Sequence, residues 1–450
     1  MSTKNNGNIM IQPHSEYAKA TYLVLHQIPS EWNIIRAKNL FRCIDIRSET
    51  GEEELLTVSS KFGVIKRKCA NVTMFKAASY KGYKLCWEGD LVINSLWAWM
   101  TGLGFSNYNG IVSTAYGVYR LHDRKINHPK YYNFLLRSIA YRWELMVRSK
   151  GVWISRLQLT NDSFLNIPML NPPFYEQVQI ARYLDYKNYQ INKYIRIKKR
   201  QIELLKELKQ VIINDAMTGK IDVRTGEPYI KYKDSGIDWL GMIPEEWIAT
   251  RFRNVCYLQR GHDLSSDKFI KGEYPVMGSN GVIGYHNQFT TKAPNITVGR
   301  SGSTGKVNFV NEDFWAHNTA LFVLHNHGND WNWLYYFILN FDMAAVSEGS
   351  AVPTLNRNYI HKIHVSVPKR ENQEDIASYI ENVIDISMGA IKIIEDEITL
   401  IRELQTRLIS DIVTGKLDVR DIEVPDIPEE ELEPGLESDD EPLEESISVD

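Results

Sequence analysis

A glycine- and serine-rich stretch with two cations spans residues 299–306 and reads Gly-Arg-Ser-Gly-Ser-Thr-Gly-Lys. Loops that cradle nucleotide phosphates have such residue types, but they require the spacing G-x-x-x-x-G-K followed by Ser or Thr. Counting back from Gly305 places Arg300 at the first glycine position, and Val307 stands where Ser or Thr is needed. The stretch therefore predicts no nucleotide site. A turn that approaches a DNA backbone and a plain hairpin turn explain it about equally well.

Residues 171–174, Asn-Pro-Pro-Phe, match the active-site motif of adenine-N6 methyltransferases, in which the amide and a proline carbonyl hold a flipped adenine. Two consecutive prolines also commonly end a strand and begin a helix. A second copy of this region, residues 366–369, reads Ser-Val-Pro-Lys and lacks the motif, and no Phe-x-Gly-x-Gly cofactor loop precedes the first copy. The structural interpretation is therefore favoured, and a self-contained adenine methyltransferase remains the alternative.

Other side chains give no catalytic or metal-binding constellation. His317 and residues 325–327 lie beside Trp and Asn without a paired carboxylate at useful spacing. Loop or core histidines explain them better than metal ligands do. The four cysteines form no Cys-x-x-Cys pair, which predicts buried, reduced thiols rather than zinc ligands or disulfides: Cys43, Cys69, Cys86 and Cys256.

Polar, basic and aromatic residues flank several short runs of strand-forming residues, which is typical of a nucleic-acid surface. Arg suits guanine edges and Asn suits adenine edges in the major groove. For any one of these residues a solvated surface side chain is the commoner explanation, so the prediction applies to the group. The predicted DNA-binding residues are Lys61, Lys66, Arg67, Lys68, Ser95, Trp97 and Asn107 in the first half, and Arg260, Lys268, Ser279, Asn280, Arg300, Lys306, Asn356 and Arg357 in the second.

The charge distribution agrees with a polyanion partner. Residues 421–450 carry 14 acidic and no basic residues, so the remaining chain has 52 basic against 42 acidic residues, a net charge of +10. Phosphate neutralisation by such a surplus supplies most non-specific DNA affinity. The acidic segment is predicted to be a disordered tail, a solubilising extension or, less favoured, an electrostatic competitor for the basic surface. No apolar run is long enough for a membrane span, and no secretory signal is visible.

The chain repeats itself. Residues 218–224, Thr-Gly-Lys-Ile-Asp-Val-Arg, recur as Thr-Gly-Lys-Leu-Asp-Val-Arg at 414–420, an offset of 414 − 218 = 196. Residues 28–32, Ile-Pro-Ser-Glu-Trp, recur as Ile-Pro-Glu-Glu-Trp at 243–247, an offset of 243 − 28 = 215. The chain is therefore two equivalent halves. The difference, 215 − 196 = 19, indicates that the opening segments of the halves differ in length while the later segments match.

Each half opens with a segment of mixed α and β character. Short β-branched runs bounded by Gly, Asn and Pro predict strands at 63–65, 91–93, 116–119 and 166–169, and at 274–276, 295–298, 320–323 and 363–367. Apolar residues at helical spacing predict one helix from about 131 to 147, begun by Pro129, and its partner from about 331 to 346.

Each half closes with a long helix whose apolar residues recur mostly every three, four or seven positions, as in a coiled coil. A helix over 177–215 would be ~58 Å long at ~1.5 Å per residue, too long to bury its seam against a small domain. Two such helices would pack antiparallel, with the mixed domains at their opposite ends and ~1 to 1.5 duplex turns apart. The predicted seam consists of Ile180, Leu184, Ile191, Ile195, Ile202, Leu205, Ile376, Ile380, Ile391, Ile394, Ile398, Ile401 and Leu408, and the same spacing takes in Leu208 and Leu404.

Together these motifs resemble the specificity subunit of type I restriction–modification systems. The features that match are the two Thr-Gly-Lys-x-Asp-Val-Arg stretches, Ile-Pro-Glu-Glu-Trp after residues 235–241, and Pro173 followed by Glu-Gln at 176–177. The resemblance spans about 17–420 and implies two target recognition domains that each read half of a bipartite DNA site. It also implies helical spacers that recruit two modification subunits and, through them, restriction subunits. Catalysis with S-adenosylmethionine, ATP and Mg²⁺ would belong to those partners, and this chain would hold no cofactor.

The resulting expectation is an α+β protein with a pseudo-two-fold internal repeat, a cytoplasmic, non-catalytic DNA-recognition subunit of a bacterial or archaeal complex. A coiled-coil adaptor that does not read DNA is a further alternative. The expected divisions are a leader at 1–16, recognition domains at 17–171 and 225–367, spacer helices with exit turns at 172–224 and 368–420, and the tail at 421–450.

Overall fold

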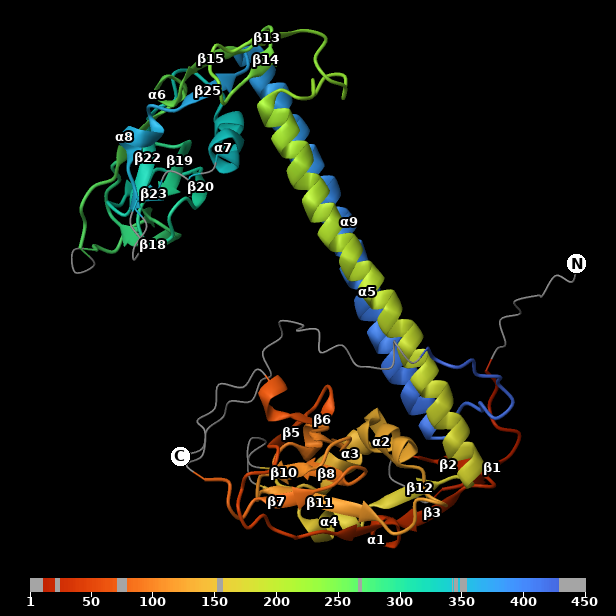
Figure 1. Cartoon of the computed structure of the whole chain (residues 1–450). Coiled ribbons are helices and arrows are strands. Elements are labelled where there is room, and N and C mark those ends of the chain that lie inside the picture. Colours follow the sequence, from red (N-terminus) through yellow and green to blue (C-terminus); the bar gives the residue numbers. More distant parts are fainter. Residues whose placement is uncertain are drawn as a thin grey trace, which may run out of the picture. The chain divides into compact units, whose positions relative to one another are not determined.

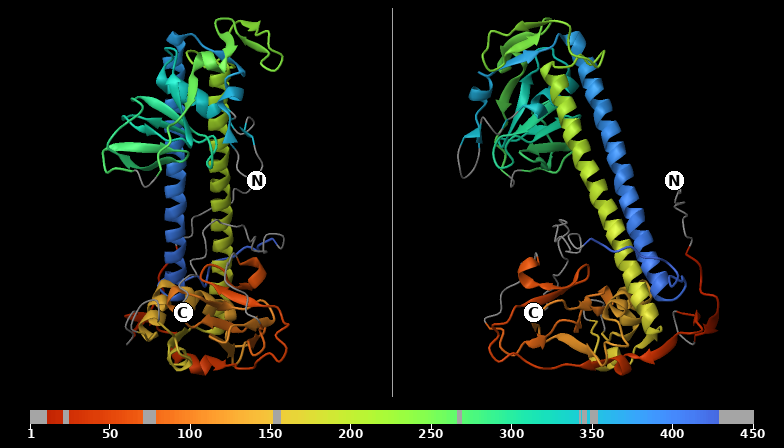
Figure 2. Two further views of the ribbon diagram at one scale, coloured as in Figure 1. Left: turned by 90° about the vertical axis from the view of Figure 1, so that its left-hand side faces the viewer. Right: turned by 45° about the vertical axis from the view of Figure 1, so that its right-hand side comes forward.

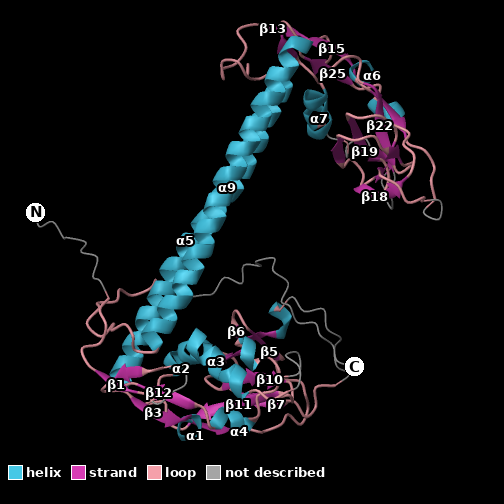
Figure 3. Ribbon diagram, turned by 180° about the vertical axis from the view of Figure 1, so that it is seen from behind, coloured by secondary structure: helices cyan, strands magenta, loops and turns pink. Residues whose placement is uncertain are grey.

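The computed structural model describes residues 11–20, 25–70, 79–151, 157–265, 269–341, 343, 347–348 and 354–428 (Figure 1). The chain forms two units by its internal contacts. Unit 1 comprises Met1–Ile197 and Asp396–Asp450, and unit 2 comprises Lys198–Glu395. Each unit thus contains one mixed domain and parts of both long helices. Figure 3 distinguishes the helices and strands of the chain by colour.

The mixed domain of unit 1 runs from β1 to β12. Its elements are β1 (Tyr17–Lys19), β2 (Gln27–Pro29), β3 (Asn33–Arg36), α1 (Ala37–Leu40), β4 (Phe41–Cys43), β5 (Leu56–Ser59), β6 (Gly63–Lys66), the 3-10 turn η1 (Arg67–Cys69), β7 (Lys84–Cys86), β8 (Leu91–Asn94), the 3-10 turn η2 (Ala98–Met100), β9 (Leu103–Phe105), β10 (Gly110–Val112), β11 (Tyr116–Leu121), α2 (Pro129–Arg137), α3 (Ile139–Arg148), α4 (Asn161–Leu165) and β12 (Pro168–Asn171).

The mixed domain of unit 2 runs from β13 to β25. Its elements are β13 (Tyr232–Asp234), β14 (Met242–Pro244), β15 (Ile248–Arg251), α6 (Phe252–Val255), β16 (Tyr257–Arg260), β17 (Tyr274–Gly278), β18 (Gly281–His286), β19 (Asn295–Gly299), β20 (Val307–Val310), β21 (Trp315–Ala316), β22 (Ala320–His325), α7 (Trp331–Asn340), β23 (Ser347–Glu348), β24 (Thr354–Leu355), α8 (Arg357–Ile360) and β25 (His364–Val367).

Both domains are built on an antiparallel four-stranded sheet with the same strand order. The orders are β4-β11-β8-β9 in unit 1 and β16-β22-β19-β20 in unit 2. Three of the strand pairs keep one offset: β8 and β19 begin 295 − 91 = 204 apart, and β9 with β20 and β11 with β22 give the same difference. The central strands are rich in buried Val, Ile and Leu, so burial on both faces explains why short β-branched runs predicted them correctly.

The helix predicted over 131–147 is wrong in one respect, because the structure breaks it into α2 and α3. Ser138 has φ −69° and ψ 158°, and its side chain accepts a hydrogen bond from the Tyr141 amide as the N-cap of α3. Serine at such a position offers the backbone an alternative to a continuous helix. The partner helix, α7, ends at Asn340, and part of its predicted remainder lies outside the described residues.

The two long helices are α5 (Phe174–Thr218) and α9 (Arg370–Val413). In unit 1 the beginning of α5 and the end of α9 share one core, through Leu184 and Ile412, and in unit 2 Ile213 near the end of α5 shares a core with Ile376 near the start of α9. The helices therefore run antiparallel in each unit, where both views of Figure 2 show them side by side, and the expected fold class is confirmed.

Every residue of the predicted seam is buried or half-buried. Leu208 and Leu404, which the same spacing included, are instead 54% and 61% exposed. A heptad pattern gives the period of a seam but not its width, and these two leucines lie just beyond the contact face.

The repeated Thr-Gly-Lys-x-Asp-Val-Arg stretches each dock on an Ile-Pro-x-Glu-Trp segment. Gly219 (φ 73°) lies so close to Pro244 that a Cβ would be 2.6 Å from its Cγ, and Gly415 (φ 75°) lies equally close to Pro29. Positive φ and this approach both require glycine. Tyr17 Oη donates to the Gly415 carbonyl at 3.0 Å, and Tyr232 Oη donates to the Gly219 carbonyl at 3.3 Å. The exit turn of each long helix thus closes a mixed domain: the turn after α5 closes the second, and the turn after α9 closes the first.

Three further expectations need correction or restriction. Cys86 and Cys256 are buried as expected, but Cys43 and Cys69 are exposed. Val424 is buried, and Ile422 and Asp426 contact α5, so the described chain stays attached beyond the predicted start of the tail; residues 429–450 lie outside the described part. Within the described chain, no helix combines the length and apolarity of a membrane span.

Candidate nucleic-acid interface

One edge of the unit 2 sheet gathers several of the predicted DNA-binding residues. Strands β16 and β19 end there and β20 and β22 begin there, since Arg260 pairs with Leu321 and Gly299 pairs with Ala320. Four connections therefore meet at one place: antiparallel order brings three of them together, and the fourth, the β17–β18 turn of another sheet, lies against Gly299. They are the segments 260–264, 279–281, 299–306 and 317–319.

The 299–306 turn is built around glycines. Gly302 and Gly305 both have φ 84°, and a Cβ on Gly299 would lie 2.5 Å from the Ser279 carbonyl oxygen. The β17–β18 turn can therefore approach this turn closely. Lys306 Nζ donates to the Asn280 side-chain oxygen at 2.8 Å and to its carbonyl at 3.1 Å. Lys306 thus orients Asn280, whose amide nitrogen keeps its capacity to donate.

An ionised carboxylate organises the cations at the same edge. Arg260 donates to Asp263 Oδ1 at 2.9 Å, and Asn318 Nδ2 donates to the same oxygen. The pKa of Asp263 lies below its usual range because Asn318 hydrogen-bonds the carboxylate and Arg260 attracts it. His317 and Arg300 add smaller favourable charge interactions. The edge therefore presents two arginines around one exposed acid.

Two more predicted residues reach this edge but are used within the fold. The Asn356 side chain accepts from the Asn358 amide at 3.1 Å and caps α8. The Arg357 guanidinium donates to the Gln259 side chain on β16. The Leu355 amide donates to the Arg300 carbonyl at 2.9 Å, which ties the segment to the 299–306 turn. Lys268 lies outside the described residues.

The equivalent edge of unit 1 has different chemistry. After β8, Trp97 and Trp99 stack with ring centroids 6.2 Å apart. Ser95 is buried, and its carbonyl accepts from the Leu159 amide at 2.9 Å. The tip of the β5–β6 hairpin reaches the same edge, because Arg137 donates to the carbonyls of Leu103 and Lys61 at 2.6 and 2.8 Å.

The structure separates the other predicted residues of the first domain from the tryptophans. Ser106 hydrogen-bonds Asp90 at the opposite end of β8 and β9, which places Asn107 at that end. Lys66 Nζ lies 5.0 Å from the centre of the Tyr108 ring and belongs to the same end. Lys68 pairs with Glu54 at 3.1 Å, and Arg67 lies beside it in η1. The first-domain group is thus divided between two ends of the sheet.

Two surface hollows contain polar residues that the sequence analysis missed. A hollow of 540 Å³ in unit 1 is lined by Arg42, Trp87, Arg120 and Arg124, among others. Arg120 holds the fully buried Asp90 with two bonds of 2.7 and 2.8 Å and lies 5.0 Å from the Trp87 ring. A hollow of 770 Å³ in unit 2 is lined by residues 290–295, 322–328 and Trp331. The signal that could have indicated Arg120 is a single cation within an otherwise uncharged strand, between the buried Tyr119 and Leu121.

Asn171, the residue of the methyltransferase-like motif, is engaged within unit 1. Its side-chain oxygen accepts from Tyr132 Oη at 2.7 Å and from Gln177 Nε2 at 3.1 Å. The motif therefore joins the end of β12 to α2 and to the first turn of α5, which favours its structural interpretation.

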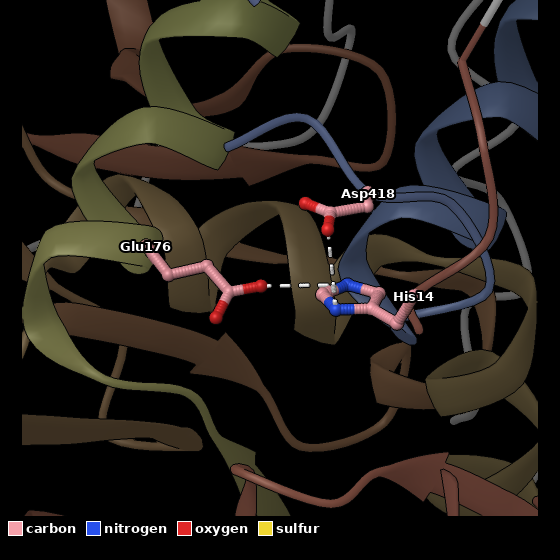
Figure 4. Close-up of side chains that lie close together, drawn as sticks. All are labelled: His14, Glu176 and Asp418. Atoms are coloured by element: carbon pink, nitrogen blue, oxygen red, sulfur yellow. Dashed lines mark ion pairs between the residues drawn. The ribbon is translucent and has the colours of Figure 1, made fainter. Parts of the chain in front are cut away.

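Among the described residues, one group combines His and carboxylates closely enough to consider a metal ion: His14, Glu176 and Asp418 (Figure 4). His14 Nε2 lies 3.4 Å from Glu176 Oε1, and His14 Nδ1 lies 3.6 Å from Asp418 Oδ2. Arg420 binds both Asp418 oxygens, at 3.1 and 2.7 Å, so they have little capacity left for a metal. Burial raises the pKa of Glu176 to about 7 and lowers the pKa of His14. The group is best explained as a buried polar cluster at the junction where residues 414–420 close the first mixed domain.

Comparison with known proteins agrees with the fold. Residues 244–400 match the family model Methylase_S, the type I restriction modification DNA specificity domain. No curated protein sequence compared with this chain matches it.

Two solved structures share the fold at low sequence identity. A chain from a structure on complex assembly and conformational transition of the type I R-M system matches with a TM-score of 0.65 and 15% identity, covering 87% of this chain and 99% of that one. The HsdS subunit from Thermoanaerobacter tengcongensis matches with a TM-score of 0.54 and 15% identity, covering 87% and 98%. The resemblance drawn from the sequence is thereby confirmed: residues 244–400 match the type I restriction–modification DNA specificity domain, and the chain shares the fold of an HsdS subunit.

Proposed function

We propose that this chain is the DNA-specificity subunit of a type I restriction–modification complex and that each mixed domain reads one half of a bipartite DNA site. The observation that carries the proposal is the repeated sheet whose equivalent edges bear different side chains. One edge has Arg260, Arg300 and Asn280, and the other has Trp97 and Trp99. Two domains with the same sheet and different edge side chains suit an asymmetric DNA site, because Arg and Asn hydrogen-bond to purine edges and Trp does not.

The long helices support the recruitment of modification subunits. Besides the buried seam, α5 and α9 carry large apolar residues that are more than a third exposed, which a monomeric helix pair has no reason to keep at such density. They occur in both units: Tyr175, Val178, Tyr194, Ile197, Leu400 and Leu404 in unit 1, and Leu204, Leu208, Val211, Ile386, Met388 and Ile393 in unit 2. Apolar helices of two modification subunits would cover them.

In this proposal the chain performs recognition and its partners perform chemistry in the cytoplasm. S-adenosylmethionine, ATP and Mg²⁺ bind to the modification and restriction subunits. The engaged Asn171 side chain agrees with this division, because its oxygen is already used in two internal hydrogen bonds.

The test is genome-wide mapping of methylated adenines in cells that carry this chain with its modification subunit. We expect one bipartite sequence with a fixed gap, and no methylation from the chain alone. Residues 299–306 and 279–281 can be exchanged for those of a specificity subunit with a different DNA target. This exchange should change one half of the recognised site and leave the length of the gap between the halves unchanged. Methylation at unrelated sequences in both cases would refute the proposal, and S-adenosylmethionine binding by the isolated chain would favour the methyltransferase alternative.

A further inference from the structure

Helix α3 belongs to a stretch in which unit 1 is longer than unit 2. The offset between the halves is 320 − 116 = 204 at β11 and β22, and it falls to 357 − 161 = 196 at α4 and α8. The 204 − 196 = 8 additional residues of unit 1 therefore lie between β11 and α4, the stretch that contains α3. Unit 2 has no equivalent of these additional residues.

The outward face of α3 is apolar. Ile139, Trp143 and Val147 are 56%, 50% and 54% exposed, and their four-residue spacing puts them in one row. The opposite face is packed, since Tyr141 and Leu145 are buried in the unit 1 core. Helix α7, which corresponds to α2, shows one large exposed apolar residue, Leu339, among its described residues.

Cations border this apolar row. Arg142 and Lys150 are exposed on the same side, and no ion pair joins either of them to an acid in the described chain. The single acid of α3, Glu144, is buried and pairs with Arg148 at 2.9 Å. Arg142 also lies 3.1 Å from Met100 Sδ, which connects the face to η2. The surface therefore suits an apolar segment that also carries negative charge.

The chain contains one segment of that kind, at its C-terminus. Residues 429–450 include 11 acidic and no basic residues. Their apolar members include Leu432, Leu436, Leu443 and Ile447, which are distributed among the acidic residues. Like α3, this segment has no counterpart in the internal repeat.

The described chain leads this segment toward unit 1. Gln179 Nε2 on α5 donates to the carbonyls of Val419 and Ile422 at 2.9 and 2.7 Å. Arg182 then pairs with Asp426 at 2.8 Å, so the chain is held against α5 up to the last described residues. The 22 residues that follow could span up to ~75 Å if extended, which is enough to reach α3 in the same unit.

We propose that the acidic C-terminal segment, residues 429–450, docks on the outward face of α3. Its leucines cover the row formed by Ile139, Trp143 and Val147, and its carboxylates lie against Arg142 and Lys150. Apolar burial supplies non-directional affinity, and the charges set the orientation. The inference concerns this chain alone and does not rest on the proposed DNA-reading function.

Hydrogen exchange measured by mass spectrometry tests the proposal on the full chain and on a chain ending at Pro428. Removal of the segment should raise exchange in α3 and η2 by about threefold or more and leave α7 unchanged. Adding a synthetic peptide of residues 429–450 to the shortened chain should restore protection. The same peptide with Leu432, Leu436, Leu443 and Ile447 replaced by Ser should not restore it.

Two surface variants of the full chain provide the matched comparison. Trp143→Glu with Val147→Glu puts acids on the proposed docking face and should raise exchange in η2 as segment removal does. Leu339→Glu makes the same kind of change on α7 and should have no effect. The proposal is overturned if removal of the segment leaves α3 exchange unchanged, if the Ser peptide protects as well as the native one, or if only added DNA protects α3.

Discussion

The two mixed domains have the same sheet and different edges. In unit 2 the edge is polar and charged, with Arg260 and Arg300 near Asp263, whereas in unit 1 it carries a stacked pair of tryptophans. The offset of 215 at the domain entrances falls to 204 at the sheets and to 196 at the long helices, so unit 1 is longer by 11 residues before its central strands and by 8 after them. The two domains therefore keep the same sheet, while their connecting segments differ in length and their edge side chains differ in chemistry.

The exit-turn junctions differ in a similar way. Trp32 Nε1 donates to Glu176 at 3.0 Å, whereas Trp247 Nε1 has no hydrogen-bond acceptor within the described part of the chain and packs beside the Tyr229 ring. Position 176 corresponds to Asn372, since 372 − 176 = 196, and Asn372 donates to Glu246 at 3.2 Å instead. Equivalent positions on α5 and α9 therefore carry a buried carboxyl group in one junction, Glu176, and a neutral amide in the other, Asn372.

The largest expected effect tests whether the starts of the two long helices, α5 and α9, are structurally equivalent. Ile180 and Ile376 are equivalent and each 1% exposed, so Ile180→Ala and Ile376→Ala should each destabilise the chain by about 2–5 kcal/mol. Chemical denaturation followed by circular dichroism measures both. Leu404→Ala, at an exposed position, is the control and should change stability by less than about 0.5 kcal/mol. A large difference between the two isoleucines would show that the helix ends are not equivalent.

The next effect tests the different edges. Arg300→Ala should weaken discrimination in one half of the bipartite site by about 10- to 100-fold, because it removes a cation suited to guanine. Trp97→Ala should act on the other half. Methylation of a randomised plasmid library, read by sequencing, measures both halves together. The assignment fails if either substitution relaxes both halves or neither.

A smaller effect compares the two junction tryptophans. Trp32→Phe should destabilise unit 1 by about 1–3 kcal/mol, because Glu176 loses its buried donor. Trp247→Phe should cost less than about 1.5 kcal/mol, because no bonded acceptor is left behind. Thermal unfolding of the two variants gives the difference, and equal losses would contradict the hydrogen-bond explanation.

The smallest effect is a pH dependence confined to the first junction. Burial raises the pKa of Glu176 to about 7 from its ordinary value of 4.5. Stability from a raised pKa is fully present below the ordinary value and is lost as the pH rises through the folded value. Wild type should therefore lose stability relative to Glu176→Gln between about pH 5 and about pH 8.

Allowing for solvent screening, we expect the Glu176→Gln difference to stay below about 1 kcal/mol. The lowered pKa of His14 reduces stability at low pH in both wild type and Glu176→Gln. Its contribution therefore largely cancels when the unfolding free energies of the two proteins are subtracted. Asn372→Gln at the equivalent neutral position is the matched control and should show no such trend. A trend of opposite sign would mean that Glu176 is ionised in the folded chain at neutral pH.

The sequence by itself determined the repeat, the central strands and the helix seam. These follow from local patterns, because β-branched runs such as 91–93 and heptad spacing such as Ile376 to Ile380 act through neighbours on the same element. It also predicted that residues 279–280 and 299–306 belong to one kind of surface. Their residue types carry that information without any knowledge of position.

Only the tertiary structure decided which of those residues meet. Packing of the β17–β18 turn on the 299–306 turn brings Asn280 to Lys306, and antiparallel pairing of β8 with β9 separates Asn107 from Trp97; neither result is visible in chain order. Ser138 could cap a helix or continue one, and packing of α3 against η2 selected the cap. Closure of the first domain by residues 414–420 is likewise a contact between distant segments. Gly415 can pack against Pro29 only because glycine has no side chain. Contacts of that range depend on how whole elements pack, which local sequence does not encode.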